Sequence, residues 1–370
     1  MSVRIAMNSL RIPQMIPHFD NLEKEALQSY MDSNPFLTEF NKTQQLEKLI
    51  CEFTGAENAI MVSNGTMSLV AMMAVLGIGP GDKVYVPNYT MIATVNAVKI
   101  LGAEPIFVDV EEETLCINIH SIPLPVHKQA KAIIFVSANG RSSSNGFEEI
   151  SNFALENNLI VLEDSAQSLG SYYSDGKHQG TKGLMGSFSF SVPKIITMGQ
   201  GGCIVTNDDE LAAKVRSFKD FGRKQGGNDL HPLFGLNLKI TDLQAVIGVV
   251  QMSKLSSRVQ RKKEIWTRYQ KNLSANSNIQ VFDHDLKFVS PWFIDVVAVE
   301  RESLIEHLAK NSIGSRRMYP PINQQPSISA PGSFPVSEKI GEFGLWLPSY
   351  VQLTDEEIDE VCDAINEFYS

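Results

Sequence analysis

The carboxylate of Asp164 and the amine of Lys194 are the two groups whose surroundings favour covalent chemistry. Asp164 lies at the end of an apolar stretch that begins at residue 159. Lys194 lies among apolar neighbours, which disfavour its ammonium form and lower its pKa. Pyridoxal 5'-phosphate (PLP) needs such a pair, a fixed carboxylate for its ring nitrogen and an amine that condenses with its aldehyde and then moves protons. Taken singly, Lys194 also fits a surface loop lysine and Asp164 a helix N-cap.

A phosphate site is predicted where a strand gives way to a helix, at Asn64-Gly65-Thr66. The free backbone N–H groups and the dipole of a helix N-terminus favour an anion. Gly65 lets the backbone approach closely, and Thr66 adds a hydroxyl. Ser189, five residues before Lys194, would donate from the other side. The alternatives are a structural cap at 64–66 and a solvent-facing strand serine at 189.

Short apolar runs predict the strands that position these residues, at 59–62, 83–86, 104–108, 132–136, 159–162, 187–190 and 202–206. Helical patterns at 66–76, 92–101 and 147–157 alternate with them. Such alternation predicts an α/β fold with a largely parallel sheet covered by helices on both faces. Sites in these folds lie at the carboxyl ends of the strands, which is where the sequence places Asp164.

The pattern changes after Gln251. A charged helix is predicted at 256–273, a strand at 292–299, an amphipathic helix at 302–311, and a last helix opened by a capping box of Thr354 and Glu357. A chain of 370 residues accommodates two domains. We predict a large domain over residues 1–250, whose N-terminal segment can pack elsewhere, and a smaller one over 251–370. The proline-rich stretch 320–335 is predicted to be a loop.

Composition argues against several classes of function. A formal net charge of −10 and a pI near 5.3 are atypical of a nucleic-acid-binding protein. No stretch reaches the roughly 18 to 20 apolar residues of a membrane span, and residues 1–7 lack the features of a signal peptide. The four cysteines form no CxxC pair, and the seven histidines do not cluster at metal-ligand spacing. We expect a cytoplasmic protein with reduced thiols and no metal site.

The segment around Asp164 and Lys194 also resembles a known family. Glu-Asp-Ser-Ala-Gln at 163–167 precedes Phe-Ser-Phe at 188–190, the lysine five residues after that serine, and Gly-Gln-Gly-Gly at 199–202. Further matching runs lie at 62–66, 76–82, 102–109, 235–245 and 316–326. Together, over about residues 20–330, they resemble the DegT/DnrJ/EryC/StrS family of sugar aminotransferases. Their shared order is far more specific than any single motif.

The resemblance implies the fold of the PLP fold-type-I aminotransferases, a large domain with a mostly parallel sheet between helices and a smaller C-terminal α+β domain. It makes Lys194 the lysine that binds the cofactor and Asp164 the partner of the ring nitrogen. Gln167 would direct its amide at the 3-hydroxyl of PLP if a helix begins after Asp164. Asn237 matches a segment that reaches the cofactor phosphate of the other subunit, which implies a homodimer with composite sites.

Three departures from the family pattern concern the ring and the substrate. The aromatic residue that usually stacks on the PLP ring is Met91, whose sulfur can cover the ring, with Tyr89 as the less favoured alternative. A family glutamate is Gln200, and the histidine of a Pro-x-His-x-Gln-Pro run is Asn323. The run 140–146 also differs, as a substrate-side difference or as a variable loop.

The run 316–326 implies the substrate contacts. Arg316 matches a substrate-facing arginine of the family, and its guanidinium suits a nucleotide pyrophosphate. Arg317 beside it can take this role instead. Tyr319 and Asn323 belong to the same run and are the other substrate-binding candidates.

The function implied by the resemblance is transfer of an amino group from L-glutamate to a nucleotide-linked keto-deoxysugar, as in the biosynthesis of polysaccharides such as O-antigens. The motif spacing leans toward amination of carbon 4, as in perosamine synthases. Amination of carbon 3 or of a cyclitol ketone, and a non-catalytic binding or regulatory protein of the same fold, are the alternatives. Lys194 argues against the family's dehydratase branch, which has a histidine there. The nucleotide, the sugar and the stereochemistry stay open.

Overall fold

The computed structural model describes residues 10–224 and 229–370. Residues 1–7, on which the signal-peptide prediction depends, lie outside this part. Among the described helices, none combines the length and the apolar character that crossing a membrane requires. The larger sheet consists of β1 (Asn58–Val62), β2 (Lys83–Pro87), β3 (Glu104–Val108), β4 (Ala130–Val136), β5 (Ile160–Asp164), β6 (Met185–Ser189) and β7 (Gly202–Thr206).

The strand order in this sheet is β1-β7-β6-β5-β4-β2-β3. The strands from β6 to β3 pair in parallel. Only β7 runs the other way, because it pairs antiparallel with both β1 and β6. The predicted parallel α/β fold is confirmed, and each predicted strand lies within two residues of the observed one. Parallel neighbours require crossover connections, and helices supply several of them.

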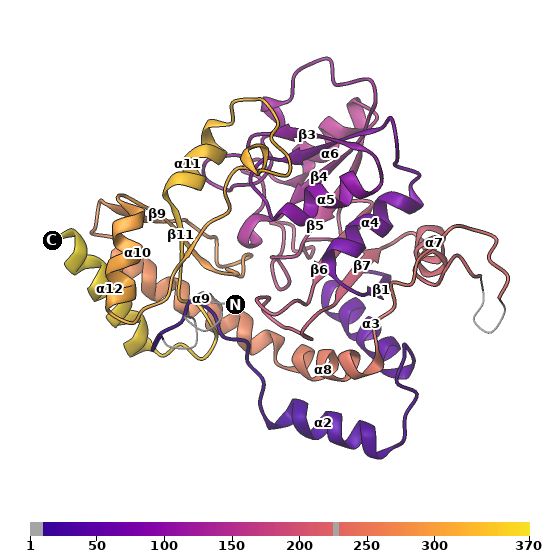
Figure 1. Cartoon of the computed structure of the whole chain (residues 1–370), viewed down its shortest axis with the longest axis horizontal. Coiled ribbons are helices and arrows are strands. Elements are labelled where there is room, and N and C mark those ends of the chain that lie inside the picture. Colours follow the sequence, from indigo (N-terminus) through magenta and orange to yellow (C-terminus); the bar gives the residue numbers. More distant parts are fainter. Residues whose placement is uncertain (1–9, 225–228) are drawn as a thin grey trace.

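Helices cover both faces of the larger sheet (Figure 1). One face is covered by α4 (Gly65–Val75), α5 (Ile92–Ile100) and α7 (Asp209–Lys219), and the other by α6 (Phe147–Glu156), α3 (Asn41–Thr54) and α8 (Asp242–Ser253). Because both faces are buried, the strands have continuous apolar runs rather than an alternating pattern. This burial is why the strands could be located from the sequence.

A second, antiparallel sheet lies in the C-terminal part of the chain, in the order β10-β11-β9-β8. Its strands are β8 (Ile279–Val281), β9 (Ile294–Ala298), β10 (Arg316–Arg317) and β11 (Gly344–Leu347), and its helices are α9 (Leu255–Leu273), α10 (Arg301–Lys310), α11 (Pro335–Phe343) and α12 (Asp355–Tyr369). Figure 1 shows α10 and α12 on the opposite side of the molecule from α7. The predicted boundary at residue 250 falls inside α8, and the division there stays a prediction.

Two sequence expectations change in detail. The predicted loop at 320–335 contains a short 3-10 helix at 322–324, and Pro335 already opens α11. Near the N-terminus, the structure adds α2 (Asn21–Asp32) and α3, while Ile12 bridges Ile313 beside the smaller sheet. The capping box of Thr354 and Glu357 is present at the start of α12.

Candidate active site

Asp164 is the last residue of β5 and is buried at the carboxyl end of the sheet. Its Oδ2 accepts a hydrogen bond from the Thr94 hydroxyl at 2.8 Å, and its Oδ1 accepts from the Ala166 backbone N–H at 3.2 Å. Burial raises the pKa of Asp164, while the Thr94 hydrogen bond and the charge of Lys194 act against the rise. Turns follow Asp164 instead of a helix, so the helix N-cap interpretation is wrong.

Lys194 lies in the turn after β6 and is half-buried. Its Nζ lies over the ring of Trp292, 4.3 Å from the ring centroid. Burial lowers the pKa of Lys194 to about 8, the charge of Asp164 opposes this change, and Arg316 adds to it. The charges of Asp164 and Arg316 therefore act on this amine, and Lys194 is not a solvated surface lysine.

The expected phosphate site lies where α4 begins next to the end of β6. Asn64 caps α4, because its Oδ1 accepts a hydrogen bond from the Met67 backbone N–H at 2.9 Å. Gly65 opens the helix, and a Cβ placed there would lie 2.9 Å from the Cβ of Ser189. Only glycine allows this close approach without a shift. Thr66 follows within the first turn of α4 and is half-buried, as is Ser189.

Gln167 lies in a turn and not in the first turn of a helix. The expectation that a helix begins after Asp164 is therefore wrong. Its Oε1 accepts a hydrogen bond from the Asn139 backbone N–H at 2.8 Å. The NH2 group of the same amide is the donor that remains for a ligand. Its contact with the 3-hydroxyl of PLP stays a prediction.

Met91 and Tyr89 differ in their exposure. The side chain of Met91 is 46% exposed, and its sulfur accepts a hydrogen bond from the Ala93 backbone N–H at the start of α5. Tyr89 is only 4% exposed and packs against Tyr319, with 5.9 Å between the ring centroids. Met91 has the more accessible surface for a ring, and it stays the preferred candidate.

The substrate candidates have different surroundings. Arg316 lies over the ring of Trp346, 5.3 Å from its centroid, whereas Arg317 donates from Nε to Oε1 of Glu302 at 2.8 Å. The side chain of Tyr319 packs edge-on against Trp346, and burial raises its pKa to about 12.

Asn323 is buried, and its Oδ1 accepts a hydrogen bond from the Asn88 side chain at 2.9 Å. The charge of Arg316 therefore acts on Lys194, and the charges of Arg316 and Asp164 act on Tyr319, while Asn323 holds the loop that follows β2.

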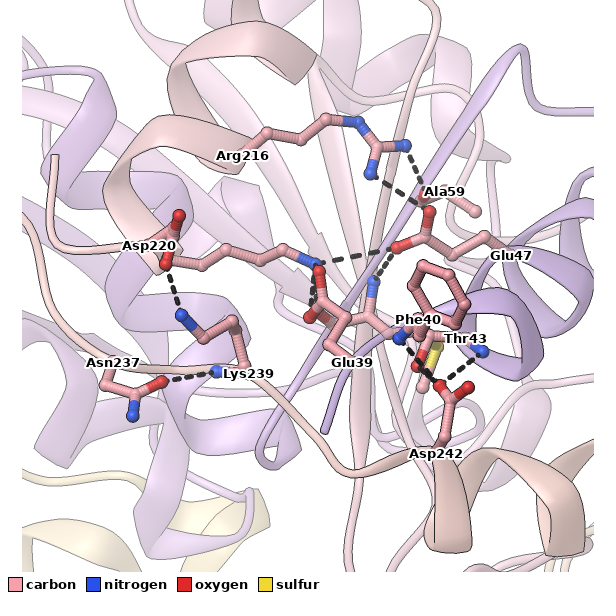
Figure 2. Close-up of polar contacts among 12 residues, drawn as sticks. Glu39, Phe40, Thr43, Glu47, Ala59, Arg216, Asp220, Asn237, Lys239 and Asp242 are labelled. Atoms are coloured by element: carbon pink, nitrogen blue, oxygen red, sulfur yellow. Dashed lines mark hydrogen bonds and ion pairs between the residues drawn. The ribbon is translucent and has the colours of Figure 1, made fainter. Parts of the chain in front are cut away.

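Asn237 is exposed and pairs with Asp220 in an isolated antiparallel bridge. Its Oδ1 accepts a hydrogen bond from the Lys239 backbone N–H at 3.4 Å, and the Lys239 ammonium contacts Asp220 (Figure 2). Figure 2 also shows Asp242 accepting hydrogen bonds from the start of α3, which ties this segment to the N-terminal helices. The described contacts of Asn237 are in this network and not with Lys194 or Asp164.

The run 140–146 has a structural role at Arg141. This buried arginine donates to Asp295 of β9 at 2.7 Å and to the Thr114 carbonyl at 2.8 Å. It therefore links the two sheets, and the sequence alone gave no sign of the partner. No group of three histidine, cysteine, aspartate or glutamate side chains in residues 10–224 and 229–370 is placed to hold a metal.

Sequence reasoning missed Thr94 and Trp292. Thr94 lies in the first turn of α5, which begins at the carboxyl end of the sheet, and this position is the signal that could have identified it. Trp292 comes from the segment before β9, far from Lys194 in the sequence, and no local pattern points to it.

The arrangement of these residues fits PLP. Asp164 is a buried carboxylate, Lys194 is an amine with a lowered pKa on which the charge of Asp164 acts, and Gly65 lets the N-terminus of α4 lie close to Ser189. Fold and site together define the class of PLP-dependent aminotransferases. The chain belongs to the DegT/DnrJ/EryC1/StrS aminotransferase family, which it matches over residues 17–366.

Similar sequences and solved structures agree with this assignment. The chain is 36% identical over 363 residues to the GDP-perosamine synthase of Escherichia coli O157:H7, which covers 97% of this chain and 99% of that protein. It is 30% identical over 368 residues to the GDP-perosamine synthase of Vibrio cholerae, with the same coverage of 97% and 99%. A DegT DnrJ EryC1 StrS aminotransferase from Brucella abortus superimposes with a TM-score of 0.88 at 28% identity, over 95% of this chain and 96% of that one.

The aminotransferase TlmJ from Streptoalloteichus hindustanus superimposes with a TM-score of 0.90 at 27% identity, over 96% of this chain and 98% of that one. The prediction of an aminotransferase is confirmed, and the alternative of a non-catalytic protein is set aside.

Proposed function

We propose that this chain transfers an amino group from L-glutamate to carbon 4 of a GDP-linked 4-keto-6-deoxysugar and so makes a GDP-perosamine-like product. The observation that carries the chemistry is the amine of Lys194, on which the charges of Asp164 and Arg316 both act. The choice of sugar is supported by the printed function of the full-length relatives, GDP-perosamine synthase. We also propose that the product enters a polysaccharide pathway.

The residues of the site have different roles in the reaction. Asp164 is the fixed carboxylate for the ring nitrogen, held in place by the Thr94 hydroxyl. When bound, PLP supplies an electron sink for negative charge on the α-carbon of the amino donor. Nζ of Lys194 would move a proton from that carbon to the aldehyde-derived carbon of the cofactor, because a pKa of about 8 leaves part of this amine neutral near pH 7.

Other residues hold the ligands. We assign the phosphate to the start of α4, with Gly65, Thr66 and Ser189, and the ring to Met91 and Gln167. Helix N-termini favour phosphate through free N–H groups and the dipole. We assign the anionic part of the sugar nucleotide to Arg316, because Arg317 is already paired with Glu302. Tyr319 and Asn323 complete the substrate side.

We further propose a homodimer in which Asn237 serves the neighbouring site. Large apolar side chains lie exposed on the segments around Asn237 and on the segment before α3, among them Phe36 (62%), Phe40 (47%) and Phe234 (79%). Exposed apolar surface of this kind marks protein–protein contacts. The four cysteines are free, which supports a reducing compartment such as the cytoplasm.

The function is tested by incubating the PLP-loaded protein and L-glutamate with GDP-, dTDP- and UDP-linked 4-keto-6-deoxysugars, followed by mass spectrometry. We expect amination of the GDP-linked sugar and none by the Lys194→Ala variant. Amination only of dTDP- or UDP-linked sugars, or only of a 3-keto sugar, would contradict the proposal.

The role of Arg316 is tested by separating the two half-reactions. Arg316→Ala should raise KM for the sugar nucleotide by about tenfold or more, because a charge-assisted contact is lost, and leave the glutamate half-reaction nearly unchanged. Arg317→Ala is the matched control. An equal loss in both half-reactions would remove the substrate role of Arg316.

A further inference from the structure

Trp292 contacts the lysine turn in two ways, although it belongs to the segment before β9. Its ring lies under the Lys194 amine, with Nζ 4.3 Å from the ring centroid. Its Nε1–H donates a hydrogen bond to the carbonyl of Pro193, the residue before Lys194, at 2.7 Å. Trp292 is only 4% exposed. One side chain therefore holds both the backbone and the amine of the lysine turn.

The ring of Trp292 is itself fixed by its neighbours. It stacks on Phe293 with 3.9 Å between centroids and meets Trp346 edge-on at 5.7 Å. The Asn139 side chain holds the Phe293 backbone on both sides, accepting from its N–H at 2.7 Å and donating to its carbonyl at 2.9 Å. The Asn139 backbone N–H donates to Gln167 at 2.8 Å. A continuous set of contacts thus runs from Gln167 to Lys194.

We propose that Trp292 is a positioning residue that holds the free amine of Lys194 in place for the cofactor and that Asn139 ties its position to Gln167. This inference rests on the proposed function, in which Lys194 binds PLP. An aromatic face suits the task, because it attracts an ammonium group without a full negative charge. Lys194 must leave its resting place in each half-reaction, and a carboxylate would hold it more tightly.

In addition to the Trp292 ring, several charged groups surround the Lys194 amine. Asp164 at the end of β5 raises the pKa of Lys194, and Arg316 in β10 lowers it, while burial has the largest effect. His18, Arg258 and Lys262 line the cavity that Lys194 also lines. All of these groups are still present when only Trp292 is changed, so a change in the titration of Lys194 reports on the ring.

The test measures the titration of Lys194 in the cofactor-free protein. Wild type, Trp292→Phe and Trp292→Leu are labelled with trace acetic anhydride between pH 6 and 10, and acetylation of Lys194 is followed by peptide mass spectrometry. Trp266→Phe is the matched control, because the Trp266 indole also donates to a backbone carbonyl, Phe282, at 3.0 Å.

We expect the pH midpoint to fall from wild type to Trp292→Phe to Trp292→Leu, with about 2- to 10-fold faster labelling near pH 7 in the leucine variant. Greater access alone would raise the plateau and leave the midpoint in place. The milder phenylalanine variant keeps the test usable if the leucine variant does not fold. Midpoints that stay at the wild-type value, or rise, would overturn the proposal. Because no sugar is present, failure of the proposed substrate would leave this result untouched.

Discussion

Two lysines, Lys194 and Lys262, line one small cavity, and burial lowers the pKa of both, to about 8 and about 7. A lowered pKa alone therefore does not identify the cofactor lysine. The charges of Asp164 and Arg316 act on Lys194, whereas burial is the one cause of the shift at Lys262, whose ammonium contacts the Ser349 carbonyl. At the residue scale, the carboxylate of Asp164 therefore distinguishes Lys194 from Lys262 as the candidate cofactor lysine.

Lys194→Ala should abolish the covalent attachment of PLP and lower turnover by at least about 1,000-fold, because one residue is both anchor and proton carrier. Borohydride reduction of the PLP-loaded protein, followed by peptide mapping, locates the modified lysine. Lys262→Met is the matched control and should keep its attachment. A reduced adduct on Lys262 or Lys182 would contradict the assignment.

The capture of PLP by the cofactor-free protein should speed up with pH, with a midpoint at about pH 8 and a plateau at higher pH, since only the neutral Lys194 amine reacts. Asp164 raises the pKa of Lys194 and Arg316 lowers it. Asp164→Asn should therefore move the midpoint of the rate profile down by about one unit, and Arg316→Ala should move it up by a smaller amount, about a few tenths of a unit. Stopped-flow absorbance at several pH values gives the midpoints, and shifts in the same direction would refute this account of the site.

At the scale of elements, the site is assembled where β5, β6 and the start of α4 meet. The close approach of α4 to β6 depends on Gly65, because a Cβ there would lie 2.9 Å from the Ser189 Cβ. Gly65→Ala should raise the Kd for PLP by about 5- to 100-fold through overpacking. Titration of the cofactor-free protein with PLP measures this change.

Gly79→Ala is the control for the added methyl group, because its Cβ would lie 3.7 Å from the Leu101 carbonyl oxygen, an ordinary contact. Thermal unfolding of both variants without cofactor shows whether the fold is intact. Unchanged PLP affinity in Gly65→Ala would mean that the phosphate does not lie beside Gly65 and Ser189.

The elements that could be predicted from sequence are those with a local cause. The strands of the larger sheet are buried on both faces and have apolar runs, and α12 has its capping box in the sequence. The position of Asp164 could be predicted because this residue lies at the end of such a strand. The contact of Trp292 with Lys194 and the pair of Arg141 with Asp295 join distant segments. They depend on how the two sheets pack, which no local pattern encodes.

At the scale of the whole molecule, the position of Asn237 favours a role in a second subunit. Its described contacts are with Asp220 and Lys239, and it lies exposed on a segment with apolar neighbours. A residue placed in this way can serve a site in a second copy of the chain. The predicted composite site then requires two subunits for each phosphate.

Mixing two inactive variants, Lys194→Ala and Asn237→Asp, should restore activity if Asn237 acts across the dimer. The carboxylate of Asn237→Asp repels the phosphate, so that homodimer binds PLP poorly. In a mixed dimer, one site contains a native Lys194 and receives a native Asn237 from its partner. Random exchange of subunits gives about a quarter of wild-type activity. Lys194→Ala mixed with Asp164→Asn is the control, because both changes lie in the same half of each site and every site keeps a defect. Activity that returns in the control mixture, or in neither mixture, would rule out the shared site.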